Sequence, residues 1–211
     1  MRLFLVAKRA ERDASYWCDA VVERANAARV RGIDVAAPPK LVFRWLCQLR
    51  VSSYSYEWAD PGGRRSPRYL LPGLDEVELG QAMMGPFELV HFVPGRELTV
   101  RLERRRMQDL SLGRWYAPAA LTYRLSESEL LTGSRLVVKS VAAFPRGARW
   151  AILRRIVAPL DAALLRRQLR TLKRLAERDW ATESERVAAA LLETPLPVLT
   201  VPAREREPVA G

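Results

Sequence analysis

The chain has 211 residues and a formal net charge of +11, with 35 Lys or Arg, 24 Asp or Glu, and a single histidine. This length suits one domain with extensions, and a domain of roughly 150 residues buries enough surface to fold without disulfides. One histidine and two isolated cysteines argue against a conventional zinc site, and we expect neither a metal nor a cofactor. Cys18 and Cys47 are expected to be free thiols in a reducing compartment.

The positive charge is carried almost entirely by arginine, since the chain has only four lysines. The arginines are spread over several segments, and no aromatic-rich basic motif of a known nucleic-acid reader is present. We therefore expect no specific nucleic-acid binding. No stretch reaches the roughly 20 apolar residues of a membrane span, and charged residues cut off the apolar opening MRLFLVA. The sequence predicts a cytoplasmic protein.

Residues 1–26 show no sustained period, so we interpret them as an N-terminal extension with at most short helix. Residues 27–35 (AARVRGIDV) alternate as an amphipathic strand does. Pro38 and Pro39 then open a helix, where the fixed φ of proline is tolerated in the first turn. Its buried stripe is predicted from helical spacing to contain Val42, Trp45, Leu46 and Leu49.

The segment that follows this helix is unusually aromatic for a loop. It carries Tyr54, Tyr56 and Trp58, interleaved with Glu57, Asp60, Arg64 and Arg65. Two interpretations remain open. The rings could cap the core, or they could form the rim of an apolar cavity, where amphipathic rings offer contact area and a polar tip. In the second case Arg64 or Arg65 could hold a carboxylate or phosphate at the cavity mouth.

Strand patterns dominate residues 77–144, separated by Gly and Pro turns. Phe87, Leu89 and His91 are predicted to share one face of their strand. Trp115 and Tyr123 are predicted to share an inward face with the alternate residues between them. Strands joined by short turns indicate an antiparallel sheet with one packed face and one wet face. The predicted strands are residues 77–83, 86–93, 97–103, 115–125 and 134–144.

After residue 147 the period changes to that of a long amphipathic helix, predicted from Ala148 to about Trp180 and kinked near Pro159. Residues 181–211 are predicted to be a largely disordered tail, in which TESERVAAALLE at 182–193 could add a helical turn or two. The domain would then span residues 27–180. The buried stripe is predicted to be Leu153, Val157, Leu160, Leu164, Leu172 and Leu175.

This order of elements is an α+β plan, in which a curved antiparallel sheet wraps around the long C-terminal helix. The chain resembles the START-like, helix-grip (SRPBCC) superfamily, which includes polyketide cyclases and dehydrases, lipid-transfer domains and the birch-pollen-allergen group. The resemblance spans about residues 29–178. It is carried by Ile33–Arg68, by GPFELVHFVPGRELTVRL at Gly85–Leu102, and by RRQLRTLKRLAER at Arg166–Arg178.

The resemblance implies an internal cavity that binds a hydrophobic small molecule or a lipid-like ligand. Some members of the superfamily catalyse reactions, so a polyketide cyclase/dehydrase-like enzyme is the alternative. Two positions depart from related sequences, which often have Asp in place of Glu57 and an acidic residue in place of His91. Predicted ligand-binding residues are Tyr54, Tyr56, Trp58, Arg64, Arg65, Phe87 and Trp115.

A cyclase-type reaction would need a base to remove a proton next to a carbonyl and a donor to stabilise the enolate. His91 and Asp60 are the candidate bases, and Tyr54, Tyr56, Tyr123 or Arg65 the candidate donors. His91 on an apolar strand and Asp60 before Pro-Gly-Gly also suit structural roles. The basic C-terminal helix could dock on an anionic membrane. Because the helix-grip plan uses its apolar face against the sheet, we do not expect membrane contact.

Overall fold

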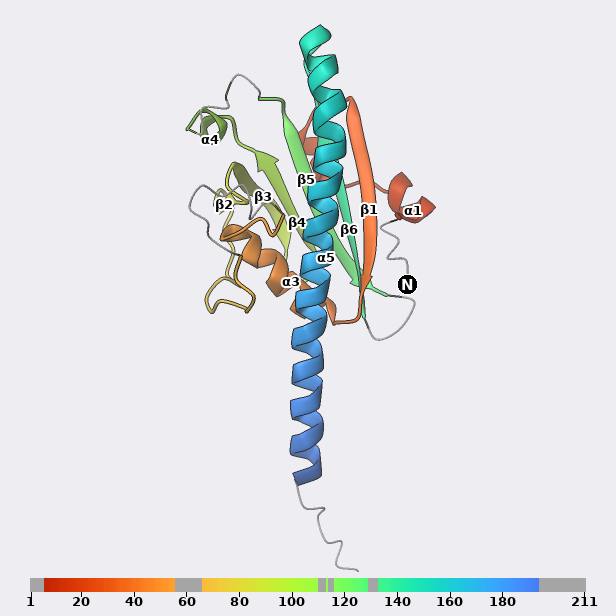
Figure 1. Ribbon diagram of the computed structural model, residues 1–211, viewed down its shortest axis with the longest axis vertical. Coiled ribbons are helices and arrows are strands. Elements are labelled where there is room, and N and C mark those ends of the chain that lie inside the picture. Colours follow the sequence, from red (N-terminus) through yellow and green to blue (C-terminus); the bar gives the residue numbers. More distant parts are fainter. Residues whose placement is uncertain (1–5, 56–65, 110–112, 114–115, 129–132, 194–211) are drawn as a thin grey trace, which may run out of the picture.

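The computed structural model describes residues 6–55, 66–109, 113, 116–128 and 133–193. Within this part of the chain, six strands form one antiparallel sheet in the order β1-β6-β5-β4-β3-β2 (Figure 1). Each strand in this order pairs with its neighbours, so the sheet is a simple meander except that β1 joins the edge beyond β6. The strands are β1 Ala27–Val35, β2 Ala82–Met83, β3 Phe87–Val93, β4 Glu97–Leu102, β5 Ala119–Glu127 and β6 Ser134–Ala142.

The helices divide between the two faces of this sheet. The long helix α5 (Ala148–Glu193) lies across the concave face, with α3 (Pro39–Cys47) and the short turn Gln48–Arg50 packed beside it (Figure 1). The first two helices, α1 (Arg9–Asp13) and α2 (Trp17–Val21), lie with the N-terminal segment, and α4 (Arg104–Asp109) follows β4. This arrangement is the predicted α+β helix-grip fold.

The main core lies between the concave face and the middle of α5. Leucines at positions 165, 169 and 172 of α5 meet inward residues of the strands and the buried face of α3. Trp45 is fully buried and its Nε1 donates a hydrogen bond to Asp179 Oδ2 at 3.1 Å, which ties α3 to α5. Val42, Trp45, Leu46 and Leu49 are all buried, as the helical spacing predicted, although Leu49 lies in the turn after α3.

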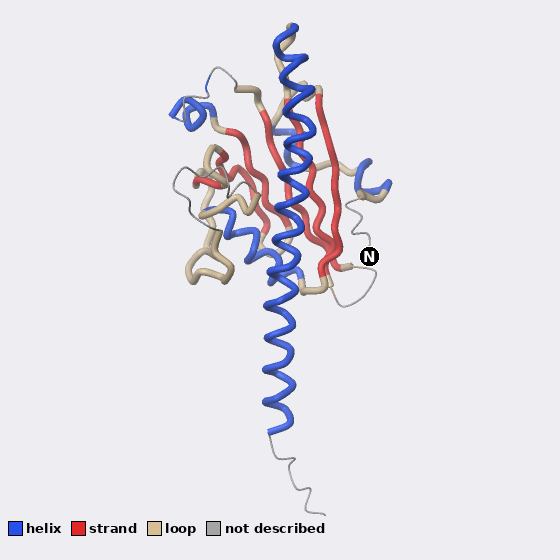
Figure 2. Tube along the Cα trace, viewed as in Figure 1, coloured by secondary structure: helices blue, strands red, loops and turns tan. Residues whose placement is uncertain are grey.

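Helix α5 is longer than the sequence pattern predicted. It runs through Pro159 as one helix and continues to Glu193, beyond the predicted end near Trp180 (Figure 2). Its last turns project beyond the sheet, and residues 181–187 are all exposed. The sequence allowed a further turn or two of helix over residues 182–193, and the structure includes this whole segment in α5. None of the helices described is long and apolar enough to cross a membrane.

The outer face of the sheet carries a second, smaller core beneath the N-terminal segment. Tyr16, Cys18 and Val22 pack against apolar residues of β5 and β6. The Cys18 amide donates a hydrogen bond of 2.9 Å to Thr122 Oγ1, so α2 is fixed to the sheet.

Both cysteines are free thiols, as expected, and both are buried. Burial raises the pKa of Cys47 to about 12 and also raises that of Cys18.

A β-bulge in β3 overturns the predicted face of His91. Leu89 pairs with Val100, but the next paired residue is His91, opposite Thr99. Val90 is therefore the extra residue, and the alternation of side chains shifts by one. Leu89 stays in the main core, whereas His91 stacks on Trp17 of α2 with ring centroids 4.1 Å apart. His91 thus lies on the outer face, opposite to Phe87 and Leu89.

Candidate functional site

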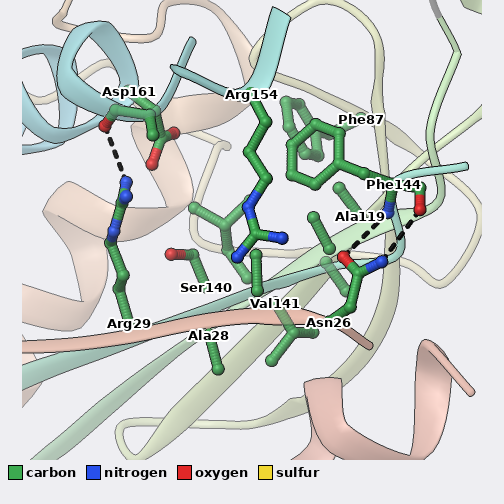
Figure 3. Close-up of a pocket in the computed structure, with 15 residues that line it drawn as sticks. Asn26, Ala28, Arg29, Phe87, Ala119, Ser140, Val141, Phe144, Arg154 and Asp161 are labelled. Carbon is green, nitrogen blue, oxygen red and sulfur yellow. Dashed lines mark hydrogen bonds between the residues drawn. The ribbon is translucent and has the colours of Figure 1, made fainter. Parts of the chain in front are cut away.

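A pocket of about 400 Å³ lies between the first half of α5 and one end of the concave sheet (Figure 3). A space between the helix and the sheet was expected, and the pocket occupies one end of that interface. The main side chains around it come from β1, β3, β5, β6 and α5, namely Asn26, Arg29, Phe87, Ala119, Leu121, Ser140, Ala142, Phe144, Arg154, Ala158 and Asp161.

Small residues in neighbouring strands create this space. The strand register aligns Ala27, Ala142 and Ala119 in one row across the sheet. The next inward row contains Arg29, Ser140 and Leu121. Alanine and serine side chains are too short to reach α5, so the helix is held above the sheet here. Further along α5, leucines fill the same interface completely.

One end of the pocket is closed by a hydrogen-bonded pair. Asn26 Nδ2 donates to the Phe144 carbonyl at 2.8 Å, and the Phe144 amide donates to Asn26 Oδ1 at 3.1 Å (Figure 3). These two hydrogen bonds to its backbone hold Phe144 in place, with its ring near that of Trp150, which is buried at the start of α5. The pocket wall at this end is therefore a fixed aromatic surface.

The polar groups of the pocket are mainly guanidinium groups. Arg29 Nη1 donates a hydrogen bond of 2.6 Å to the Ala158 carbonyl, which ties β1 to α5. Arg154 reaches from α5 over the sheet (Figure 3) and has no hydrogen-bond or ion-pair partner among the residues that the structure describes. Nearby, Arg31 Nε is buried without a hydrogen bond, and burial together with Arg166 lowers the pKa of Arg31.

Asp161 is the one carboxylate among the residues that line this pocket. Burial raises its pKa, and the neighbouring Arg29 and Arg31 offset only part of that effect. A half-buried carboxyl with a raised pKa is a candidate proton acceptor or donor. The pocket thus has two guanidinium groups, those of Arg29 and Arg154, and one carboxylate. This excess of positive charge favours a ligand with an anionic group.

The predicted site residues are only partly brought together. Phe87 lines the pocket, as expected for a cavity-facing residue. Tyr54 instead lies in the main core with its ring edge-on to Trp45, and it does not line the pocket. Tyr123 is fully buried in the same core and donates a hydrogen bond of 2.7 Å to Gln168 Oε1.

Tyr54 lies well away from the pocket, beside a later part of α5. Gln168 donates a hydrogen bond of 2.6 Å to the carbonyl of Ser53, the residue before Tyr54. Ten residues of helix, or about 15 Å, separate Gln168 from Ala158 in the pocket. Core packing therefore accounts for Tyr54, which was one of the two interpretations of the aromatic segment. The remaining candidates Tyr56, Trp58, Asp60, Arg64, Arg65 and Trp115 lie outside the described residues, and their roles stay predictions.

Sequence reasoning missed Arg29, Arg154 and Asp161. One signal was available, because Asp161 is the only acidic residue between positions 148 and 174, in an otherwise basic helix. An isolated acid of this kind often has a specific environment. Arg29 and Arg31 also share the inward face of the predicted strand with Ile33 and Val35, which is an unusual place for a charged side chain.

Two larger hollows in the described structure are surface grooves. One of about 540 Å³ lies between α3 and the projecting part of α5 and is lined by charged residues such as Lys40 and Glu183. Another of about 740 Å³ borders the turn between β3 and β4, around Gly95 and Arg96. Neither lies between the concave sheet and the helix, so the pocket beneath α5 is the candidate site.

No protein-family model matches the chain, and no curated protein matches it. Solved structures do match. Protein MLL2253 from Mesorhizobium loti is 14% identical, with a TM-score of 0.40, over 72% of this chain and 98% of the other. CV1439 from Chromobacterium violaceum is 13% identical, with a TM-score of 0.41, over 71% and 97%. CalU16 from Micromonospora echinospora is 15% identical, with a TM-score of 0.36, over 79% and 89%.

Proposed function

We propose that this protein binds a hydrophobic small molecule or lipid-like ligand in the pocket beneath α5, and that the ligand carries an anionic group. The observation that carries the proposal is an apolar pocket of about 400 Å³ beside the guanidinium of Arg154, which has no partner among the described residues. Ligand pockets in proteins usually measure about 300–1,000 Å³ and combine apolar walls with a few polar groups.

Each part of the ligand has a corresponding wall. Phe87, Leu121 and Phe144 offer apolar and aromatic surface to the body of the molecule. Arg154 offers the planar donor geometry that binds carboxylate or phosphate with two parallel hydrogen bonds. Arg29 is already bonded to the Ala158 carbonyl, so it supports the anion mainly through its charge.

Binding can be measured with 8-anilinonaphthalene-1-sulfonate, an aromatic probe with one anionic group, whose fluorescence rises in apolar surroundings. Native mass spectrometry of the purified protein would show a co-purifying ligand. Arg154→Gln should weaken probe binding roughly 10- to 100-fold, because a hydrogen bond to a charged group contributes about 1.5–3 kcal/mol. Arg170→Gln is the matched control, since Arg170 is exposed on the same helix and does not line the pocket.

A second variant tests the apolar part of the site. Ala142→Phe adds a ring to the row of small residues and should displace the probe while the thermal melt reports that the fold is kept. If Arg154→Gln and Ala142→Phe both bind the probe as tightly as the unchanged protein does, the pocket is not the binding site.

The alternative is a polyketide cyclase-like enzyme that uses the same pocket. The buried environment of Asp161 supports this alternative, because it raises the pKa of a carboxyl group in the pocket. A carboxylate with a raised pKa could accept a proton next to a carbonyl, and Arg154 could stabilise the resulting enolate. Incubation with a linear poly-β-ketone, followed by mass spectrometry, tests this reaction. Asp161→Asn should abolish cyclisation while probe binding is retained. No turnover by the unchanged protein would remove the enzyme hypothesis, and equal turnover by the Asn variant would exclude Asp161 as the base.

A further inference from the structure

The first half of α5 exposes a row of large apolar side chains to solvent. Ile152, Ile156 and Leu160 are 63%, 62% and 49% exposed. Their spacing of four residues places them on one side of the helix, and we call them the apolar stripe. Leu160 was predicted to be buried, and that prediction is wrong. It faces away from the sheet because the pocket side of the helix is occupied by Ala158 and Asp161.

The same side of α5 becomes strongly basic about two turns further on. Eighteen residues make five full turns of an α-helix, so Arg170 lies in line with Ile152, and Arg174 in line with Ile156. Arg166, Arg167, Arg170 and Arg174 are all exposed, and we call them the basic segment. The only acid between positions 148 and 174 is Asp161, which lines the pocket on the other side.

No described element covers this face. α5 lies outermost on its side of the sheet, with the strands and α3 behind it (Figure 1). The face therefore combines exposed apolar side chains with a row of positive charge on one rigid helix. An interfacial helix that binds anionic lipid needs this combination, because apolar side chains enter the acyl boundary while arginines meet the headgroups.

We propose that the solvent face of α5 docks on an anionic membrane surface, through the apolar stripe and the basic segment. A second copy of the chain is a poorer partner. A two-fold symmetric contact centred on the apolar stripe would leave the basic segments of both copies without an anionic partner. A nucleic acid would match the charge but would leave the isoleucines exposed. The docking rests on the surface alone, so it does not depend on what the pocket binds.

The test is co-sedimentation of the full chain with vesicles of phosphatidylcholine alone or mixed with phosphatidylglycerol. We expect binding to the anionic vesicles only, with weakening at high salt. Replacing both isoleucines (Ile152→Ser with Ile156→Ser) should reduce binding about tenfold or more. Replacing two arginines (Arg170→Gln with Arg174→Gln) should reduce it roughly tenfold.

Val187→Ser is the matched control for the apolar stripe. Val187 is 52% exposed on the same helix but lies in its projecting end, so this variant should bind vesicles normally. Three results would overturn the proposal. They are no binding to anionic vesicles, equal binding by the isoleucine variant, and a dimer in lipid-free sedimentation that the isoleucine variant abolishes. Displacement from vesicles by duplex DNA, with the isoleucine variant retaining DNA binding, would assign the basic segment to nucleic acid instead.

Discussion

Replacing Glu11 with glutamine tests what holds the N-terminal helices to the sheet. Arg135 of β6 is almost buried, and its guanidinium donates to both oxygens of Glu11, at 2.7 and 3.0 Å. It also donates to Asp34 Oδ2 at 3.1 Å and to the Val6 carbonyl at 2.8 Å. Gly32 leaves the room for this arginine, because a Cβ at that position would lie 2.3 Å from Arg135 Nη2.

The loss of stability expected from Glu11→Gln can be estimated from these contacts. The side chains of Arg135 and Glu11 are only 8% and 14% exposed, so solvent screens the pair weakly. A hydrogen bond to a charged group contributes about 1.5–3 kcal/mol. Glutamine keeps the shape and one acceptor, and Asp34 still neutralises part of the charge. Glu11→Gln should therefore lower the free energy of unfolding by about 2 kcal/mol, or the Tm by about 4–8 °C for a chain of this size.

The pH dependence gives an independent check. Burial raises the pKa of Glu11, but the hydrogen bonds from Arg135 and the Lys8 amide outweigh it, so the folded-state pKa lies below the ordinary value of 4.5. The stabilisation is therefore present above the unfolded-state pKa and is lost as the pH falls through the folded-state pKa. The difference between the unchanged protein and Glu11→Gln should shrink in acid.

Urea unfolding followed by tryptophan fluorescence measures both effects. Asp13→Asn is the control on the same helix, because Asp13 is 68% exposed and its contact with Arg9 is 3.7 Å. Exposed pairs of this kind contribute little, so the control should unfold at the same urea concentration as the unchanged protein. The reasoning fails if Glu11→Gln behaves like this control, or if its deficit is as large in acid as at neutral pH.

Two further predictions concern the candidate site. Asp161→Asn should stabilise the protein at neutral pH, because burial raises the pKa of Asp161 and the folded state loses stability as the pH rises from the unfolded-state to the folded-state pKa. Thermal melts should show this gain disappearing below pH 3.8, the ordinary pKa of the group; a less stable variant at neutral pH would contradict the reasoning. Tyr123→Phe should cost about 1–2 kcal/mol through the hydrogen bond to Gln168, with probe binding unchanged. Lost binding at full stability would place Tyr123 in the site after all.

The sequence by itself determined the order and type of the main elements. The predicted first strand, residues 27–35, coincides with β1, and Val42, Trp45 and Leu46 are buried in α3 as predicted, although Phe43 and Cys47 are buried there as well. These predictions succeeded because alternation and helical spacing are local, and the residues that carry them face one continuous core. The α+β plan followed from that order, and the helix-grip architecture was what the family resemblance implied.

Tertiary structure alone decided which residues form the candidate site. A single extra residue in β3 moves His91 to the outer face, and no local pattern marks a bulge that depends on the pairing with β4. The aromatic segment pointed to one region, yet Tyr54 is in the core and the pocket lies nearer the start of α5. The pocket exists because small residues of three strands align in register, and register is a property of the paired strands.

Tertiary structure also decided which apolar side chains of α5 are exposed to solvent. The leucines and isoleucines of its first half look the same in the sequence as those of its middle, but only the middle lies over large inward side chains. Where the sheet offers alanine and serine, the helix stands off, and a pocket forms beneath it while an apolar stripe remains on its outer side. Which apolar residues are buried thus depends on which side of α5 faces the sheet, and the packing of the helix on the strands fixes that side.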